Sequence, residues 1–193
     1  MLRRGQLEFD IARIERIHSG KVLSGVAVLE RGGGLTEWSY ALSSGPDTGF
    51  RRLQMVCTGS RNTPLSVERQ PDGLIVFEGA RGREEHHADL AFCLETPSHL
   101  FCLSNALTAS GEKRLKTEGL AISCQTGSAT SMDICVEQDG SRRFRASFNN
   151  SLKVEFSTHP LIAVTQTSDG WENAAPFEKS VSRVLGSRSL PGG

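Results

Sequence analysis

Two residues in the stretch REEHHADLAFCLET, residues 83–96, have the types and the spacing of metal ligands. His87 and Asp89 are two positions apart, so on a β-strand their side chains would emerge from the same face. One strand could then present an imidazole nitrogen and a carboxylate oxygen to one metal ion. A histidine from a distant strand would complete a two-histidine, one-carboxylate triad, which leaves positions open on ferrous iron for substrate and oxygen.

The sequence supplies such a histidine. The motif HAD at residues 87–89 is followed 72 positions later by His159 in VEFSTHPLIAVTQTSDG, which resembles the HxD…H ligand pattern of iron and 2-oxoglutarate dependent oxygenases. The resemblance implies a double-stranded β-helix that binds Fe or another divalent metal through His87, Asp89 and His159. That family usually places a basic residue beyond the last histidine, and this chain has Asp-Gly-Trp at 169–171. A cupin-like site is a related alternative, although the adjacent His86 and His87 would point to opposite faces of a strand unless a bulge intervenes.

A simpler interpretation of these residues competes with the metal site. If Leu90, Phe92 and Leu94 face the core, the alternating residues that include His87, Asp89 and Cys93 face the other way. In a β-sandwich that polar face meets solvent. His159 falls on the polar face of its own strand in the same manner, and the position of His99 after ETPS suggests the rim of a hairpin. Catalytic residues and a cofactor therefore stay unassigned.

Other catalytic motifs are absent from the sequence. RGGGLTE at 31–37 lacks the phosphate-loop lysine and the G-x-G-x-x-G spacing, and no G-x-S-x-G elbow occurs. The five cysteines are odd in number and never form C-x-x-C, which argues against a zinc ribbon or a thioredoxin-like motif. Most of them stand among apolar residues, where a free thiol behaves as a small hydrophobe.

The elements that would position these residues are strands. Short alternating segments separated by Gly, Pro and Asp turns predict an all-β fold, an antiparallel β-sandwich or a jelly-roll-like barrel of about 10–12 short strands. Gln70-Pro71-Asp72-Gly73 and Gln138-Asp139-Gly140-Ser141 are expected to be hairpin turns. No amphipathic helix pattern lies between the strands, which argues against an α/β fold.

One helix is expected near the end of the chain. In ENAAPFEKSVSRVLG, Pro176 suits a first helical turn, apolar residues follow at helical spacing, and Gly186 suits a helix end. The sequence thus predicts a single all-β domain over residues 1–186 that includes a capping helix at about 174–185, and a flexible tail at 187–193.

Composition limits the function. The chain has 22 basic and 22 acidic residues among its 193, so no net charge draws it to nucleic acid, and the basic cluster SRRFR at 141–145 suggests a solvated hairpin strand. No signal peptide or membrane span is apparent, and the odd cysteine count fits a cytoplasmic protein without a membrane partner.

The leading hypothesis is a non-catalytic binding or assembly module, compatible with a homo-oligomer or a protein partner. A metal-dependent oxygenase-like or cupin-like enzyme is the alternative.

Overall fold

The computed structural model describes most of the chain. The described residues are 2–4, 8–31, 34–45, 50–58, 64–79, 81–93, 95–124, 126–140, 142–150, 152–157, 163–167 and 171–173. The predicted helix at 174–185 and the tail at 187–193 lie outside them, as does His159. No helix within the described ranges has the length and apolar character needed to cross a lipid bilayer.

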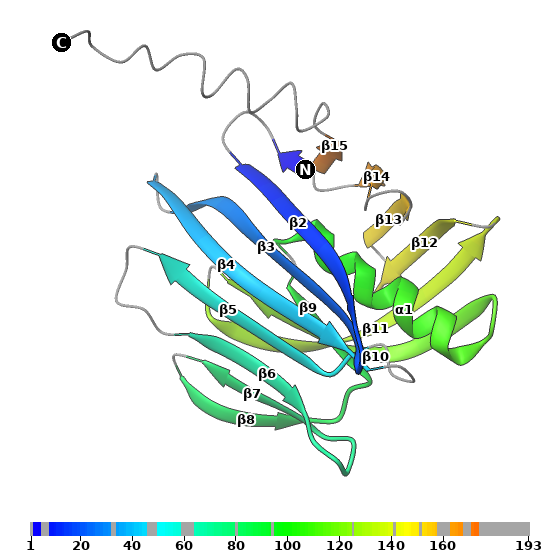
Figure 1. Ribbon diagram of the computed structural model, residues 1–193, viewed down its shortest axis with the longest axis horizontal. Coiled ribbons are helices and arrows are strands. Elements are labelled where there is room, and N and C mark those ends of the chain that lie inside the picture. The colour runs from blue at the N-terminus through cyan, green and yellow to red at the C-terminus, as the bar shows by residue number, and fades with distance from the viewer. Residues whose placement is uncertain are drawn as a thin grey trace, which may run out of the picture.

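Two β-sheets make up the fold, which confirms the all-β sandwich prediction (Figure 1). The nine-stranded sheet has the order β15-β1-β2-β3-β4-β5-β6-β7-β8. Its strands are β1 (Leu2–Arg4), β2 (Glu8–Ile17), β3 (Gly20–Arg31), β4 (Gly34–Ser44), β5 (Arg52–Thr58), β6 (Leu65–Arg69), β7 (Ile75–Gly79), β8 (Gly82–His86) and β15 (Trp171–Asn173). From β1 to β8 this order is that of a meander, because consecutive strands pair antiparallel.

The six-stranded sheet has the order β14-β13-β12-β11-β10-β9. Its strands are β9 (Leu90–Cys93), β10 (Arg114–Ser123), β11 (Ser128–Asp139), β12 (Arg143–Phe148), β13 (Leu152–Ser157) and β14 (Ala163–Thr167). The described strands do not close into a barrel and outnumber the 10–12 expected, in part because the sequence pattern does not separate the short strands β1, β8 and β15 from their neighbours.

Both predicted hairpin turns join antiparallel strands. The turn at 70–73 lies between β6 and β7, where the Gly73 N–H donates to the Gln70 carbonyl oxygen at 3.0 Å. Between β11 and β12, the turn contains Gly140. Gly73 and Gly140 have φ values of +91° and +80°, the left-handed region that glycine adopts without steric cost.

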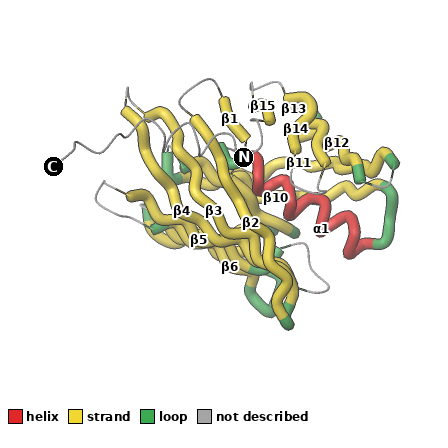
Figure 2. Tube along the Cα trace, turned by 45° about the horizontal axis from the view of Figure 1, so that its top comes forward, coloured by secondary structure: helices red, strands yellow, loops and turns green. Residues whose placement is uncertain are grey.

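A helix connects β9 to β10, which pair in parallel. It consists of a 3-10 turn, η1 (Pro97–His99), and α1 (Leu100–Ser110), and it ends at Gly111, whose φ of +71° is the left-handed conformation common after helices. The prediction of no helix between strands is wrong at this position. Figures 1 and 2 show α1 lying between the two sheets.

The core is one continuous cluster of buried residues from both sheets and α1. α1 packs against β9, β10 and β11, and all four residues of β9 are buried. The expectation from alternation that Cys93 faces solvent is therefore wrong, whereas the expectation that the cysteines among apolar residues are buried is confirmed at Cys93. Alternation holds in β5, where Leu53, Met55 and Cys57 are buried and the residues between them are exposed.

Candidate functional site

The residues of the predicted metal triad lie between strands or outside the described structure. His87 and Asp89 are in the connection from β8 to β9, and both side chains are exposed. The sequence pattern predicts that the two side chains share one face of a strand, and they do not, because neither residue is in a strand. His159 lies outside the described residues, so its convergence with the other two stays a prediction.

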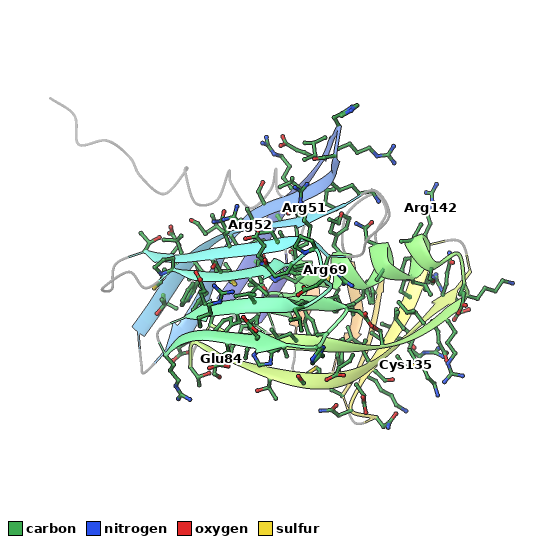
Figure 3. All side chains as sticks on the ribbon, turned by 90° about the horizontal axis from the view of Figure 1, so that it is seen from below. Arg51, Arg52, Arg69, Glu84, Cys135 and Arg142 are labelled. Atoms are coloured by element: carbon green, nitrogen blue, oxygen red, sulfur yellow. The ribbon has the colours of Figure 1, made fainter. Side chains whose placement is uncertain are left out.

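The contacts of Asp89 give this residue a structural role. Its Oδ2 accepts a hydrogen bond of 2.5 Å from the Thr117 hydroxyl of β10, and its carbonyl oxygen accepts one of 2.6 Å from Nη1 of Arg69 in β6 (Arg69 is labelled in Figure 3). Nη2 of Arg69 is 4.0 Å from Oδ1. Asp89 thus links the two sheets at this end of the fold.

A buried polar network holds η1 against the nine-stranded sheet. Asp10 of β2 is fully buried, and its Oδ1 accepts a hydrogen bond from the Tyr40 hydroxyl at 2.5 Å, while Oδ2 accepts one from the Ser98 N–H at 2.8 Å. His99 packs edge-on against Tyr40, with ring centroids 4.6 Å apart, and its Nδ1 accepts a hydrogen bond from the Cys93 N–H at 3.0 Å. The expectation that His99 lies at a hairpin rim is wrong, because η1 carries it into the core.

Burial governs the ionisation of this network. It raises the pKa of Asp10, although the hydrogen bonds from Tyr40 and Ser98 act in the opposite direction. Burial also raises the pKa of Tyr40, as does the adjacent Asp10, and it lowers the pKa of His99 to about 3. His99 is therefore a neutral imidazole at physiological pH, and its Nε2 has no hydrogen-bond partner within the described part of the chain.

An open pocket of about 420 Å³ lies between the β2–β3 hairpin and α1. Its lining comes from both elements and from the end of β4: Arg16, Ile17, Gly20, Lys21, Gly45, Asn105, Thr108 and Ala109. The hairpin can approach β4 closely because Gly20 has no side chain; a Cβ there would lie 1.9 Å from the Ser44 carbonyl oxygen. The pocket is thus formed where the hairpin end, β4 and the helix meet.

Two cations face each other across this hairpin. Arg16 and Lys21 are direct cross-strand neighbours, and both line the pocket. Lys21 Nζ donates a hydrogen bond of 2.7 Å to Asn105 Oδ1 and lies 5.6 Å from the centre of the Phe101 ring. The amide of Asn105 in turn donates to the Ser44 hydroxyl at 2.7 Å. Partial burial lowers the pKa of Lys21, and the charge of Arg16 lowers it further.

Sequence reasoning did not identify this pocket. The break at His18-Ser19-Gly20 is visible in the sequence, and a two-residue turn there would place Arg16 opposite Lys21. The hairpin side of the pocket could therefore have been predicted. The other half is on α1, which the sequence pattern did not predict.

Three metal-donor side chains converge elsewhere, and they are not those of the predicted triad. Within the described residues, Cys93, Glu95 and Cys124 form a group whose donor atoms all lie within 4.8 Å of one another. Two of the three, Cys93 and Cys124, are cysteines that the sequence analysis interpreted only as small hydrophobic core residues.

No protein-family model matches the chain, and no curated protein matches it. Among solved structures, the fold is similar to that of a DUF1089 family protein from Pseudomonas aeruginosa, with a TM-score of 0.65 over 89% of this chain and 95% of that chain. The sequence identity is 15%, so the likeness shows the fold alone.

Proposed function

We propose that the chain is a non-catalytic binding module that holds a small anionic ligand, one with a phosphate or carboxylate group, in the pocket between the β2–β3 hairpin and α1. One observation carries the proposal: Arg16 and Lys21 are opposed cations at the pocket, and none of the described residues that line it is acidic.

This arrangement costs stability unless an anion is present. Like charges directly opposite each other on paired strands are destabilising. The polar partner of the Lys21 ammonium is the neutral amide of Asn105, which leaves two of its three N–H donors for a ligand. A bound anion would accept hydrogen bonds from both cations and offset their repulsion, and such charge-assisted bonds are about twice as strong as neutral ones.

The lining favours binding over catalysis. The described residues that line the pocket include no histidine, cysteine, aspartate or glutamate, so Lys21 and Thr108 are the side chains there with base or nucleophile chemistry, and neither has a carboxylate or an imidazole beside it in the lining. Arg16 and Lys21 supply charge and donors, and Ile17 supplies an apolar wall.

The binding proposal takes precedence over an assembly role. The edge strand β8 carries Arg83, Glu84 and Glu85, and charged side chains on an edge discourage strand pairing between molecules.

We propose no nucleic-acid partner, because the net charge is zero and Arg145 of the basic cluster is paired with Glu155 at 3.0 Å. A cytoplasmic location belongs to the same proposal, since reducing conditions keep thiols reduced and no disulfide joins the five cysteines.

Titration with inorganic phosphate at low ionic strength, followed by amide chemical shifts in NMR spectra, tests the proposal. We expect saturable shifts at Lys21 and Asn105. Lys21→Met and Arg16→Met should each weaken binding by about tenfold or more, the value of one hydrogen bond to a charged group.

Arg13→Met is the matched control. It removes the same charge from the same strand, but Arg13 pairs with Glu15 at 2.7 Å and does not line the pocket. Equal weakening in Arg13→Met would reduce the effect to overall charge and overturn the proposal, as would the absence of localised shifts in the wild-type protein.

A further inference from the structure

A second site lies where β9 and β10 end. Cys93 is the last residue of β9, Glu95 follows two residues later, and Cys124 comes directly after β10. Because β9 and β10 run parallel with Cys93 beside Ile122, their carboxyl ends meet at one edge and bring the three side chains together.

The donor atoms of these residues are in mutual contact. The two sulfur atoms are 2.9 Å apart, and the Cys93 thiol donates to Glu95 Oε2 at 3.1 Å. Cys93 and Cys124 are 2% and 1% exposed, and Glu95 is half-buried. Two thiols and a carboxylate therefore share one largely enclosed volume.

Neighbouring groups fix the carboxylate in this position. The Ser123 hydroxyl donates to Glu95 Oε1 at 2.6 Å, and the Cys124 N–H donates to Oε2 at 3.1 Å. Such second contacts orient metal ligands and raise the affinity of metal sites. A further soft donor is close, because the Met55 sulfur lies 3.7 Å from the Cys124 sulfur.

We propose that Cys93, Cys124 and Glu95 bind a zinc ion. Zinc accepts both thiolate sulfur and carboxylate oxygen, and this mixed donor set suits zinc better than copper(I), which selects sulfur. The ion would take both thiolates and the carboxylate oxygen, and it would displace one proton from each thiol to solvent. This site shares no residue with the anion pocket, so the two proposals stand or fall separately.

The distance of 2.9 Å between the two sulfur atoms lies between that of a disulfide, about 2.05 Å, and that of two thiolates on one zinc ion, so the experiment below separates these two products. Two thiolates on a tetrahedral zinc lie about 3.8 Å apart, given Zn–S bonds of about 2.3 Å, so zinc would move the sulfurs apart rather than together.

Protonation agrees with this reaction. The hydrogen bond with Cys93 raises the pKa of the Cys124 thiol, and burial raises it further. Zinc binds cysteine as the thiolate, so it must compete with protons for the two sulfur atoms. Zinc affinity should accordingly increase with pH.

Cobalt(II), a spectroscopic substitute for zinc, provides the test. The full chain, reduced and freed of metal, is titrated with cobalt(II), and the near-ultraviolet thiolate-to-cobalt charge-transfer band is measured. We expect saturation at one equivalent, reversal by zinc, and a native mass increased by one zinc less two protons.

Variants assign the band to this cluster. Cys93→Ser and Cys124→Ser should abolish it, and Glu95→Gln should weaken cobalt binding by about tenfold or more. Cys102→Ser is the matched control, because Cys102 is also fully buried but lies on α1 outside the cluster. Circular dichroism establishes that each variant is folded.

Three results would overturn the proposal: no band in the wild-type protein, a band that persists in the serine variants, or a mass loss of two protons that marks a disulfide instead. If a serine variant does not fold, Glu95→Gln and the wild-type titration decide, and unchanged cobalt affinity in Glu95→Gln then counts against the site.

Discussion

The hydrogen bond between Tyr40 and Asp10 should contribute measurably to stability. Tyr40→Phe keeps the ring that packs on His99 and removes the hydroxyl that donates to Asp10 Oδ1 at 2.5 Å. The carboxylate is fully buried, so no water replaces the lost donor. Removing the donor leaves a buried carboxyl oxygen unsatisfied, which costs about 1–3 kcal/mol, so we expect the free energy of unfolding to fall by that amount. For a chain of this size that loss lowers Tm by about 2–12 °C.

Urea denaturation at neutral pH measures this loss, and a double-mutant cycle with Asp10→Asn isolates the pair. We expect a coupling energy above about 1 kcal/mol, because residues in one hydrogen-bond network are not additive. Thr58→Val is the control: its hydroxyl bonds Glu37 at 3.3 Å on the exposed face, and its removal should cost less than about 0.5 kcal/mol. A Tyr40→Phe loss no larger than that of the control, or an additive cycle, would refute the reasoning.

The same pair predicts a pH dependence. Burial raises the folded-state pKa of Asp10 above its ordinary value of 3.8, so the folded protein binds this proton more tightly than the unfolded chain does. Its contribution to stability is therefore greatest below pH 3.8 and decreases as pH rises through the folded-state pKa. Asp10→Asn should remove this component of the stability–pH curve. Tyr40→Phe should extend it to higher pH, because it removes a hydrogen bond that lowers the pKa. An unchanged curve in Asp10→Asn would contradict the assignment.

Three further predictions follow from other parts of the structure. Gly20→Ala should lower the free energy of unfolding by about 2–5 kcal/mol, because the φ of Gly20 is +138° and the new Cβ would meet the Ser44 carbonyl. Gly82→Ala should lower it by only about 1–2 kcal/mol, because Gly82 has a φ of +108° but open space around its Cα. Urea denaturation compares the two variants. Leu107→Ala, at 1% exposure on α1, should cost about 2–5 kcal/mol in the same assay. Phosphate affinity should fall with rising pH through the lowered pKa of Lys21, and Lys21→Arg should remove that fall in an NMR titration.

Much of the strand architecture follows from sequence because alternation reports directly on a sheet with one buried face. β13 is an example: Val154 and Phe156 are buried, whereas Lys153 is exposed and Glu155 is partly exposed, as the pattern predicts. Local turn chemistry was equally informative at Gly73 and Gly140, since positive φ at glycine depends only on neighbouring backbone atoms.

The helix α1 escaped prediction because it lacks the polar stripe that marks a surface helix. Its first five residues, Leu100 to Ser104, are all buried, so the segment has no 3.6-residue periodicity to detect. Only Pro97 before it and Gly111 after it marked its limits. Asp10 was equally hidden, since a buried carboxylate is stable only through partners 30 and 88 residues away.

The crossover through η1 and α1 explains why the site residues were beyond sequence reasoning. By joining β9 to β10 in parallel, it brings Cys93 to Cys124, which are 31 residues apart. It also places Asn105 against Lys21, 84 residues away. A direct hairpin between β9 and β10 would reverse β10 and create neither contact. Both candidate sites therefore depend on the one connection that strand alternation does not predict, and any variant that displaces α1 should impair anion and zinc binding together.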